Sequence, residues 1–277
     1  MTERNLKGFR KAQPEEVQAI QLEILQDVLD FCSQEGIRVF MALGSLIGVI
    51  RHQGYIPWDD DIDIWMFRED YERFIETYNL NNEKYNVSAV SNNNKHPFPF
   101  AKISDTKTRQ FEQVEGKDYN VGINIDLFPV DHLPLDVSQQ VKMLKKWDRL
   151  KAIHTLKGIN RNKKRDWHKN LILLLGNAMF GITKIETVCK KMDTLAQTYK
   201  NSPSEKVFTH EGRMVLDRAW FSETIMLPFE NIKVPVPKEY DAILKKIYGN
   251  YMQLPPEDKR VAHHLYESFV ADGLALK

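Results

Sequence analysis

The sequence is poor in cysteine and in net charge. Its two cysteines, Cys32 and Cys189, lie far apart among apolar neighbours. They form neither a disulfide framework nor a zinc-type spacing, so we expect buried free thiols in a reducing cytosol. Thirty-nine basic residues nearly balance 38 acidic ones. Overall charge therefore gives no argument for a nucleic-acid partner, although a local basic patch is left open.

Long apolar runs are also missing. A membrane-spanning helix needs roughly 18 to 20 apolar residues, whereas the longest candidate, residues 171–182 (LILLLGNAMFGI), has 12. Residues 1–13 are polar and basic, unlike a secretory signal. A cytoplasmic location is therefore expected.

The pattern of apolar residues divides the chain into two parts. In residues 1–133 it predicts helices over 14–34, 46–51 and 68–78, and strands over 37–43, 62–67, 87–90, 98–103 and 121–128. In residues 134–277 it predicts long helices over 137–156 and 167–199, a hairpin over 224–236 and a short helix over 237–248. We therefore expect an α+β protein, with a catalytic core in 1–133. A mostly helical region, 134–277, would complete its site.

Four aspartates crowd the segment WDDDIDIW at residues 58–65, namely Asp59, Asp60, Asp61 and Asp63. Asp61 and Asp63 are two positions apart at the start of a strand, so both side chains point to one face. Crowded carboxylates repel one another unless a cation lies among them, and their hard oxygens suit Mg²⁺ or Mn²⁺. We predict that Asp61 and Asp63 bind such an ion; a solvated surface loop is the alternative.

A third carboxylate, Asp126, follows in the apolar segment INIDLFPVD. If its strand pairs beside the first, it completes a three-carboxylate cluster able to hold two ions; otherwise it is a buried structural aspartate. Gly44 and Ser45 form a strand-to-helix turn, which can present backbone N–H groups to a phosphate. This order of strand, Gly-Ser turn, helix, D-x-D strand and later aspartate strand is typical of the nucleotidyltransferase fold.

Residues 42–74, ALGSLIGVIRHQGYIPWDDDIDIWMFREDYERF, resemble the LicD family of phosphocholine transferases. Further matching segments are IDLFPVD at 125–131 and stretches within 229–264. The resemblance implies a nucleotidyltransferase-like mixed sheet and a CDP-activated donor. Phosphocholine, or ribitol phosphate as in fukutin-type enzymes, would pass to a sugar of a cell-surface glycan such as lipopolysaccharide or teichoic acid. Asp61, Asp63 and Asp126 would bind metal, Asp126 would be the base, and Gly44 and Ser45 would line the donor phosphates.

The resemblance implies a mechanism in which the acceptor hydroxyl attacks the phosphorus next to the alcohol and CMP leaves. Two metal ions and Asp126 would assist. Arg51 and Lys102 are candidates to contact the diphosphate, although each could be simply solvated. Arg260, His263 and His264 fit either C-terminal packing or the site.

Aromatic residues flank the acidic segment. Trp58, Trp65 and Tyr55 could form a cage for a quaternary ammonium group, although core packing is the better explanation for Trp65. The basic run RNKKR at 161–165, ahead of the apolar stretch at 171–182, suggests either contact with an anionic membrane that carries lipid-linked acceptors or a solvated loop. Two other functions are open: a D-x-D glycosyltransferase using a nucleotide sugar, and a non-catalytic nucleotide-binding module.

Overall fold

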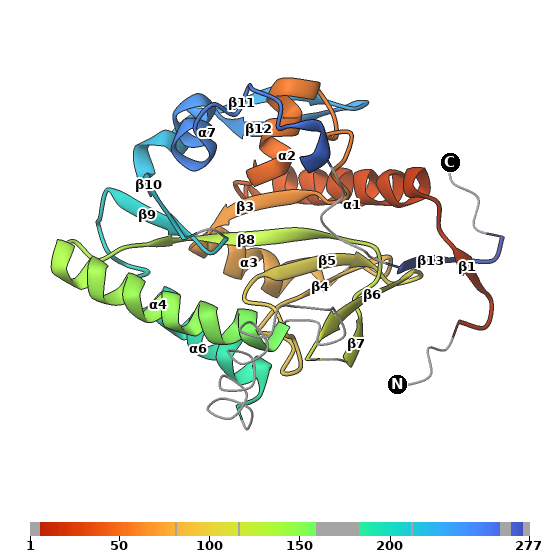
Figure 1. Ribbon diagram of the computed structural model, residues 1–277, viewed down its shortest axis with the longest axis horizontal. Helices are drawn as coiled ribbons and strands as arrows, with labels where there is room; N and C mark the ends of the chain where they lie inside the picture. Colours follow the sequence, from red (N-terminus) through yellow and green to blue (C-terminus); the bar gives the residue numbers. More distant parts are fainter. Residues whose placement is uncertain are drawn as a thin grey trace.

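A seven-stranded mixed sheet forms the centre of the molecule (Figure 1). The structure is a computed structural model, and it describes residues 6–80, 82–115, 117–158, 183–211, 213–260 and 267–273. The strands of this sheet are β2 (Phe40–Met41), β3 (Asp63–Phe67), β4 (Tyr85–Ser88), β5 (Ala101–Asp105), β8 (Asn124–His132), β9 (Lys206–Thr209) and β10 (Met214–Asp217).

Strand β8 organises the sheet because three strands pair with it. β3 runs parallel to β8 along one edge. β5 and β9 run antiparallel to it, β5 beside its first half and β9 beside its last three residues. β2, β4 and β10 extend the sheet by pairing with β3, β5 and β9. The start of β8 therefore lies between β3 and β5.

Two smaller sheets lie beside the central one. The first has the order β1-β13-β6-β7, and β11 and β12 form a separate hairpin. The bounds of these strands are β1 (Phe9–Lys11), β6 (Arg109–Val114), β7 (Lys117–Asn120), β11 (Thr224–Phe229), β12 (Ile232–Pro237) and β13 (Glu267–Ala271).

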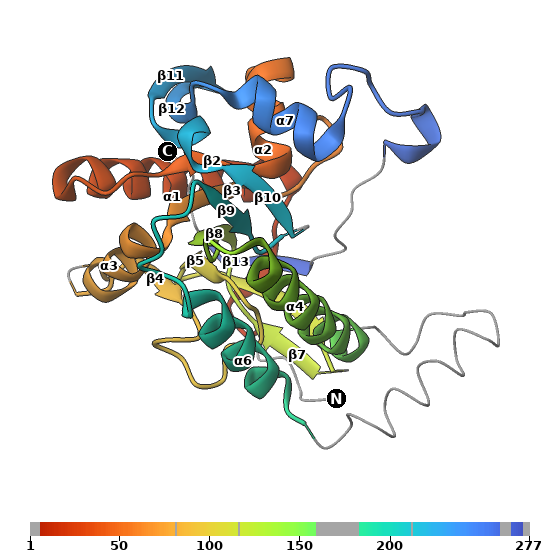
Figure 2. The same ribbon diagram turned by 90° about the vertical axis from the view of Figure 1, so that its left-hand side faces the viewer.

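Helices cover the central sheet on both sides. Figures 1 and 2 show α1 above it and α4 with α6 below it, while α2 and α7 lie near the β11–β12 hairpin. The helices are α1 (Pro14–Glu35), α2 (Leu43–Ile47), α3 (Arg68–Tyr78), α4 (Val137–Gly158), α6 (Ile185–Gln197) and α7 (Tyr240–Tyr248), with a π-helical turn η1 (Gly48–His52) and 3₁₀ turns η2 (Arg218–Phe221) and η3 (Glu257–Lys259). Within the described ranges, no helix combines the length and the apolar character required to cross a bilayer.

The core forms where the predicted apolar runs meet. All five residues of β3 are buried, and Trp65 is fully enclosed, which confirms its role in packing. Cys32 and Cys189 are buried free thiols, as expected. Helix α1 ends at Gly36, whose φ of 62° is the left-handed conformation that favours glycine.

The α+β class and the mixed sheet are confirmed. Helix α3 and the β11–β12 hairpin lie where the sequence predicted them. The strand predicted over 37–43 shortens to Phe40–Met41, because the chain turns into α2 at Leu43. The second half of the chain contributes more strand than expected, since β9 and β10 join the central sheet. The division at residue 133 stays a prediction, and residues 161–165 and 171–182 lie outside the described ranges.

Candidate active site

Asp63, Asp126 and Lys102 form a row across three neighbouring strands. The parallel pairing of β3 with β8 sets Asp63 opposite Asp126. The antiparallel pairing of β8 with β5 sets Asp126 opposite Lys102. Side chains that are directly opposite on paired strands share one face of the sheet. The structure therefore brings Asp63 beside Asp126, as the sequence predicted, and adds a lysine to the same row.

Asp63 is a buried carboxylate surrounded by other acids. The residue is only 8% exposed, and its backbone N–H donates to Ser45 Oγ at 2.9 Å. Burial raises the pKa of Asp63 well above its usual value, and the neighbouring charges of Asp61, Asp126 and Asp59 raise it further. Ionised Asp63 therefore needs a cation nearby, because burial and like charge both favour the neutral acid.

The aspartates before Asp63 converge at one point. Asp59, Asp60 and Asp61 each offer an oxygen, and these oxygens lie within 4.8 Å of one another. All three residues are half-buried. Among the described residues this is the one group of three acids that meets so closely, so Asp61, Asp63 and Asp126 do not form such a group by themselves. The oxygen donors and the buried charge of Asp63 nevertheless suit a hard divalent cation.

Gly44 makes room for one of these acids. A β-carbon at position 44 would lie 2.8 Å from Asp59 Oδ2, which is closer than atoms tolerate. The preceding residue, Leu43, has a φ of 46°, a conformation that is costly for a leucine. The Gly44–Ser45 turn thus contacts the acidic segment at both ends, since Gly44 meets Asp59 and Ser45 binds the backbone of Asp63.

Gln21 is a supporting residue that the sequence analysis missed. Its amide donates to the carbonyl oxygens of Asp60 (3.0 Å) and Asn124 (3.2 Å). Its own oxygen accepts from the hydroxyl of Tyr55 at 3.2 Å. Gln21 therefore ties α1, β8 and the acidic segment together. The signal was a glutamine on the apolar face of α1, between Ile20 and Ile24.

Asp126 and Lys102 form a buried ion pair, with Lys102 Nζ 2.7 Å from Asp126 Oδ1. Burial raises the pKa of Asp126 to about 6, although Lys102 opposes that shift. A carboxyl group with such a pKa is suited to accept and release protons near neutral pH.

Two arginines, Arg51 and Arg260, contact residues around the acidic segment. Arg51 donates to the carbonyl of Tyr251 at 2.7 Å and to His52 Nε2 at 2.9 Å. The guanidinium of Arg260 lies 5.7 Å from the centre of the Trp58 ring. The chain after α7 therefore folds back onto the segment around Asp59. His263 and His264 lie outside the described residues.

The three residues of the predicted aromatic cage have different surroundings in the structure. Trp65 is in the core, and the hydroxyl of Tyr55 is bonded to α1 through the carbonyl of Gln18 (3.2 Å). Trp58 is half-buried, with the His52 ring 6.2 Å away at its edge. Of the three, Trp58 is thus the one whose ring lies beside His52 and Arg260.

Tyr248 and Glu211 are two further residues that sequence reasoning missed. Tyr248 ends α7 and is 44% exposed. Desolvation of its hydroxyl, followed by the charges of Asp63, Asp59 and Glu211, raises the pKa of Tyr248. Glu211, in the turn after β9, likewise raises the pKa of Asp63. No local sequence motif identifies either residue as part of the site, because the folding of β9 and α7 against the acidic segment brings them there.

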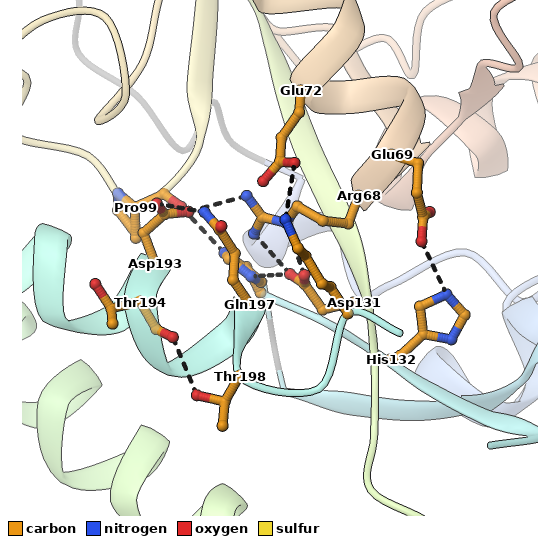
Figure 3. A network of polar contacts seen from close by, with 12 residues as sticks. Arg68, Glu69, Glu72, Pro99, Asp131, His132, Asp193, Thr194, Gln197 and Thr198 are labelled. Carbon is orange, nitrogen blue, oxygen red and sulfur yellow. Dashed lines mark hydrogen bonds and ion pairs between the residues drawn. The ribbon is translucent and has the colours of Figure 1, made fainter. Parts of the chain in front are cut away.

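A buried ion network supports the turn that carries Glu211 (Figure 3). Arg68 donates from Nε and Nη2 to the two oxygens of Asp131, at 2.7 and 2.8 Å, and from Nη1 to Asp193 at 2.9 Å. The ring of His210 lies between Asp131 Oδ2 (2.6 Å) and the carbonyl of Pro99 (3.0 Å). The network therefore fixes α3, β8 and α6 against the residue that precedes Glu211.

Residues 36–149, which contain the Gly-Ser turn and the aspartates, match the model of the LicD/FKTN/FKRP nucleotidyltransferase domain. The chain is also 28% identical over 275 residues to the lipopolysaccharide cholinephosphotransferase LicD of Haemophilus influenzae. That similarity covers 95% of this chain and 100% of the relative. Residues 36–149 thus match the LicD family.

Two other relatives match shorter stretches of the chain. An uncharacterized protein of Rickettsia typhi is 31% identical over 74 residues, 27% of this chain and 23% of its own length. An uncharacterized protein of Rickettsia prowazekii is 38% identical over 48 residues, 17% of this chain and 18% of its own length.

Proposed function

We propose that this protein transfers phosphocholine, or a related phospho-alcohol, from a CDP-activated donor to a sugar hydroxyl of a cell-surface glycan and releases CMP. The observation that carries the proposal is the similarity along 95% of the chain to a relative named a lipopolysaccharide cholinephosphotransferase. The row of Asp63, Asp126 and Lys102 across β3, β8 and β5 supports it, because the two adjacent carboxylates can serve as metal ligand and general base.

The proposal assigns the acidic segment to a divalent ion. Asp61 and Asp63, with Asp59 and Asp60 beside them, would hold Mg²⁺ or Mn²⁺, and Asp126 lies next to Asp63 in the sheet. Such an ion, when bound, stabilises negative charge on the donor phosphates. Burial of Asp63 among like charges, with no hydrogen-bond donor to its carboxylate among the described residues, supports this role.

The remaining residues bind and orient the reactants. Asp126 accepts the proton of the acceptor hydroxyl while the new oxygen–phosphorus bond forms and the bond to CMP breaks. The turn at Gly44 and Ser45, which contacts Asp59 and Asp63, binds the donor diphosphate together with Arg51. Most of the rate increase then comes from alignment and from stabilisation of charge.

The location and the acceptor are part of the same proposal. We place the reaction in the cytoplasm, which the buried free thiols Cys32 and Cys189 support. A lipid-linked acceptor at the inner face of a membrane would bring the protein there as a peripheral partner. Binding to vesicles that contain anionic lipid tests this contact, and co-sedimentation equal to that with neutral vesicles would contradict it.

A donor panel tests the reaction class. CMP release is measured with Mg²⁺ or Mn²⁺ from CDP-choline, CDP-ribitol and CDP-glycerol, each with a surface-glycan acceptor, and UDP release from UDP-sugars in parallel. Metal-dependent release from one CDP-alcohol is the expected result and identifies the alcohol. Release from a UDP-sugar alone would replace the proposal with a glycosyltransferase, and nucleotide binding without turnover would favour a non-catalytic module.

A further inference from the structure

Lys102 is a lysine buried inside the site, with 3% of its surface exposed. Three oxygens surround its ammonium group: Asp126 Oδ1 at 2.7 Å, Glu112 Oε1 at 3.0 Å and Asn124 Oδ1 at 3.2 Å. Asp126 and Asn124 accept hydrogen bonds from it, whereas Glu112 is paired with its charge without hydrogen-bond geometry. The ammonium is therefore already paired with two carboxylates of the chain.

The surroundings of Lys102 hold its charge in place. The centres of the Phe98 and Phe100 rings lie 4.8 and 5.4 Å from Nζ. The ammonium lies 2.7 Å from one carboxylate and 3.0 Å from a second, so its positive charge is fixed next to Asp126 by two opposite charges.

A two-metal site places its ions roughly 3.5–4 Å apart, with acids shared between them. Here the acids gather at two points, and Asp63 lies beside Asp126 in the sheet. Asp59, Asp60 and Asp61 meet at one point, while Asp126 and Glu112 converge on Lys102. A second divalent ion at Asp126 would have to bind Oδ2 while the Lys102 ammonium is 2.7 Å from Oδ1, so two cations would share one carboxylate and repel each other.

We infer that the Lys102 ammonium takes the place of a second metal ion at Asp126, so that the site holds one exchangeable divalent ion. Lys102 is thus a positioning residue, which orients Asp126 and neutralises Glu112 rather than contacting the donor. This inference rests on the proposed metal-dependent transfer. It replaces the two ions expected from the sequence with one ion and one fixed lysine.

The stoichiometry of Mn²⁺ binding tests the inference on the full-length protein. Calorimetric titration should give one Mn²⁺ per chain, and electron paramagnetic resonance should show an uncoupled Mn²⁺ signal. Two Mn²⁺ per chain with a spin-coupled signal would overturn the role of Lys102 while leaving the proposed function intact. Absence of Mn²⁺ binding, with and without CDP-choline, would instead refute the metal-dependent function itself.

The Lys102→Met variant provides a second test, since methionine keeps the side-chain length and removes the charge. Asp126 and Glu112 should then recruit a second Mn²⁺, and the resonance signal should become spin-coupled. A folded variant that still binds a single ion would contradict the inference. The matched control is Lys157→Met, which removes another largely buried lysine, 2.8 Å from Glu115, and should leave one Mn²⁺. Circular dichroism verifies folding, and the wild-type stoichiometry remains decisive if the variant does not fold.

Discussion

Replacing Arg68 by methionine should destabilise the protein strongly, because it leaves a buried acid without its main partner. Arg68 is 1% exposed and Asp131 is fully buried. The variant would lose the paired contacts at 2.7 and 2.8 Å to Asp131 and the contact at 2.9 Å to Asp193. Breaking a buried ion pair from one side costs about 3–5 kcal/mol. For a chain of this size each kcal/mol shifts the Tm by about 2–4 °C, so we expect a fall on the order of 10 °C.

Urea denaturation followed by far-ultraviolet circular dichroism measures the effect on the free energy of unfolding. The control is Lys238→Met, which removes an exposed ion pair with Glu223 and should cause no measurable change. A loss of less than about 1 kcal/mol in Arg68→Met would refute the reasoning, because an unpaired buried Asp131 cannot be so well tolerated.

The same pair has a defined pH dependence. Burial would raise the pKa of Asp131, but the guanidinium of Arg68 and the ring of His210 hold it well below the ordinary value. A carboxyl group with a lowered folded-state pKa contributes stability above its unfolded pKa, which is about 3.9, and loses that contribution on acidification. Arg68→Met should therefore reduce the steepness with which unfolding free energy falls below about pH 4.

Three further predictions have defined outcomes. Gly44→Ala should displace the Asp59 carboxylate and lower kcat/KM roughly tenfold or more. Gly158→Ala, whose new carbon would have no atom of the described residues within 4 Å, should not, and equal activity of both would contradict the role of Gly44. Mn²⁺ at a hundred times its Kd should stabilise the wild type by about 2.7 kcal/mol, and Asp63→Asn should show clearly less stabilisation in thermal melts. In metal-free protein Asp63→Asn should raise stability at neutral pH. The raised folded-state pKa of Asp63 makes stability fall as pH rises above its unfolded value, and an unchanged neutral-pH stability would argue against that burial cost.

The sequence predicted the parts of the site that depend on local pattern. Alternation along residues 62–67 and 121–128 indicated two buried strands, and a pair of aspartates on them could meet only if the strands were adjacent. The structure pairs Asp63 with Asp126 in register. The roles assigned to these acids stay predictions until binding is measured.

The remaining features depend on long-range pairing that no local pattern records. Lys102 meets Asp126 because β5 runs antiparallel to β8, and Glu112 joins them from the second sheet. Arg68, Asp131 and His210 are separated by 63 and 79 positions along the chain. The polar strands β6 and β7 lack an apolar alternation, so the pairing of β6 with β13 and with β7 was not foreseen.

The central claim is that the chain moves a phospho-alcohol from a CDP-linked donor in a reaction that depends on Asp63. The most direct measurement is the incorporation of isotopically labelled phosphocholine from CDP-choline into a surface glycan, with Mn²⁺ or Mg²⁺ and with chelator. The account predicts metal-dependent labelling by the wild type, coupled to CMP release, and loss of labelling in folded Asp63→Asn. Labelling that persists in the folded variant, or that is unaffected by chelator, would contradict it.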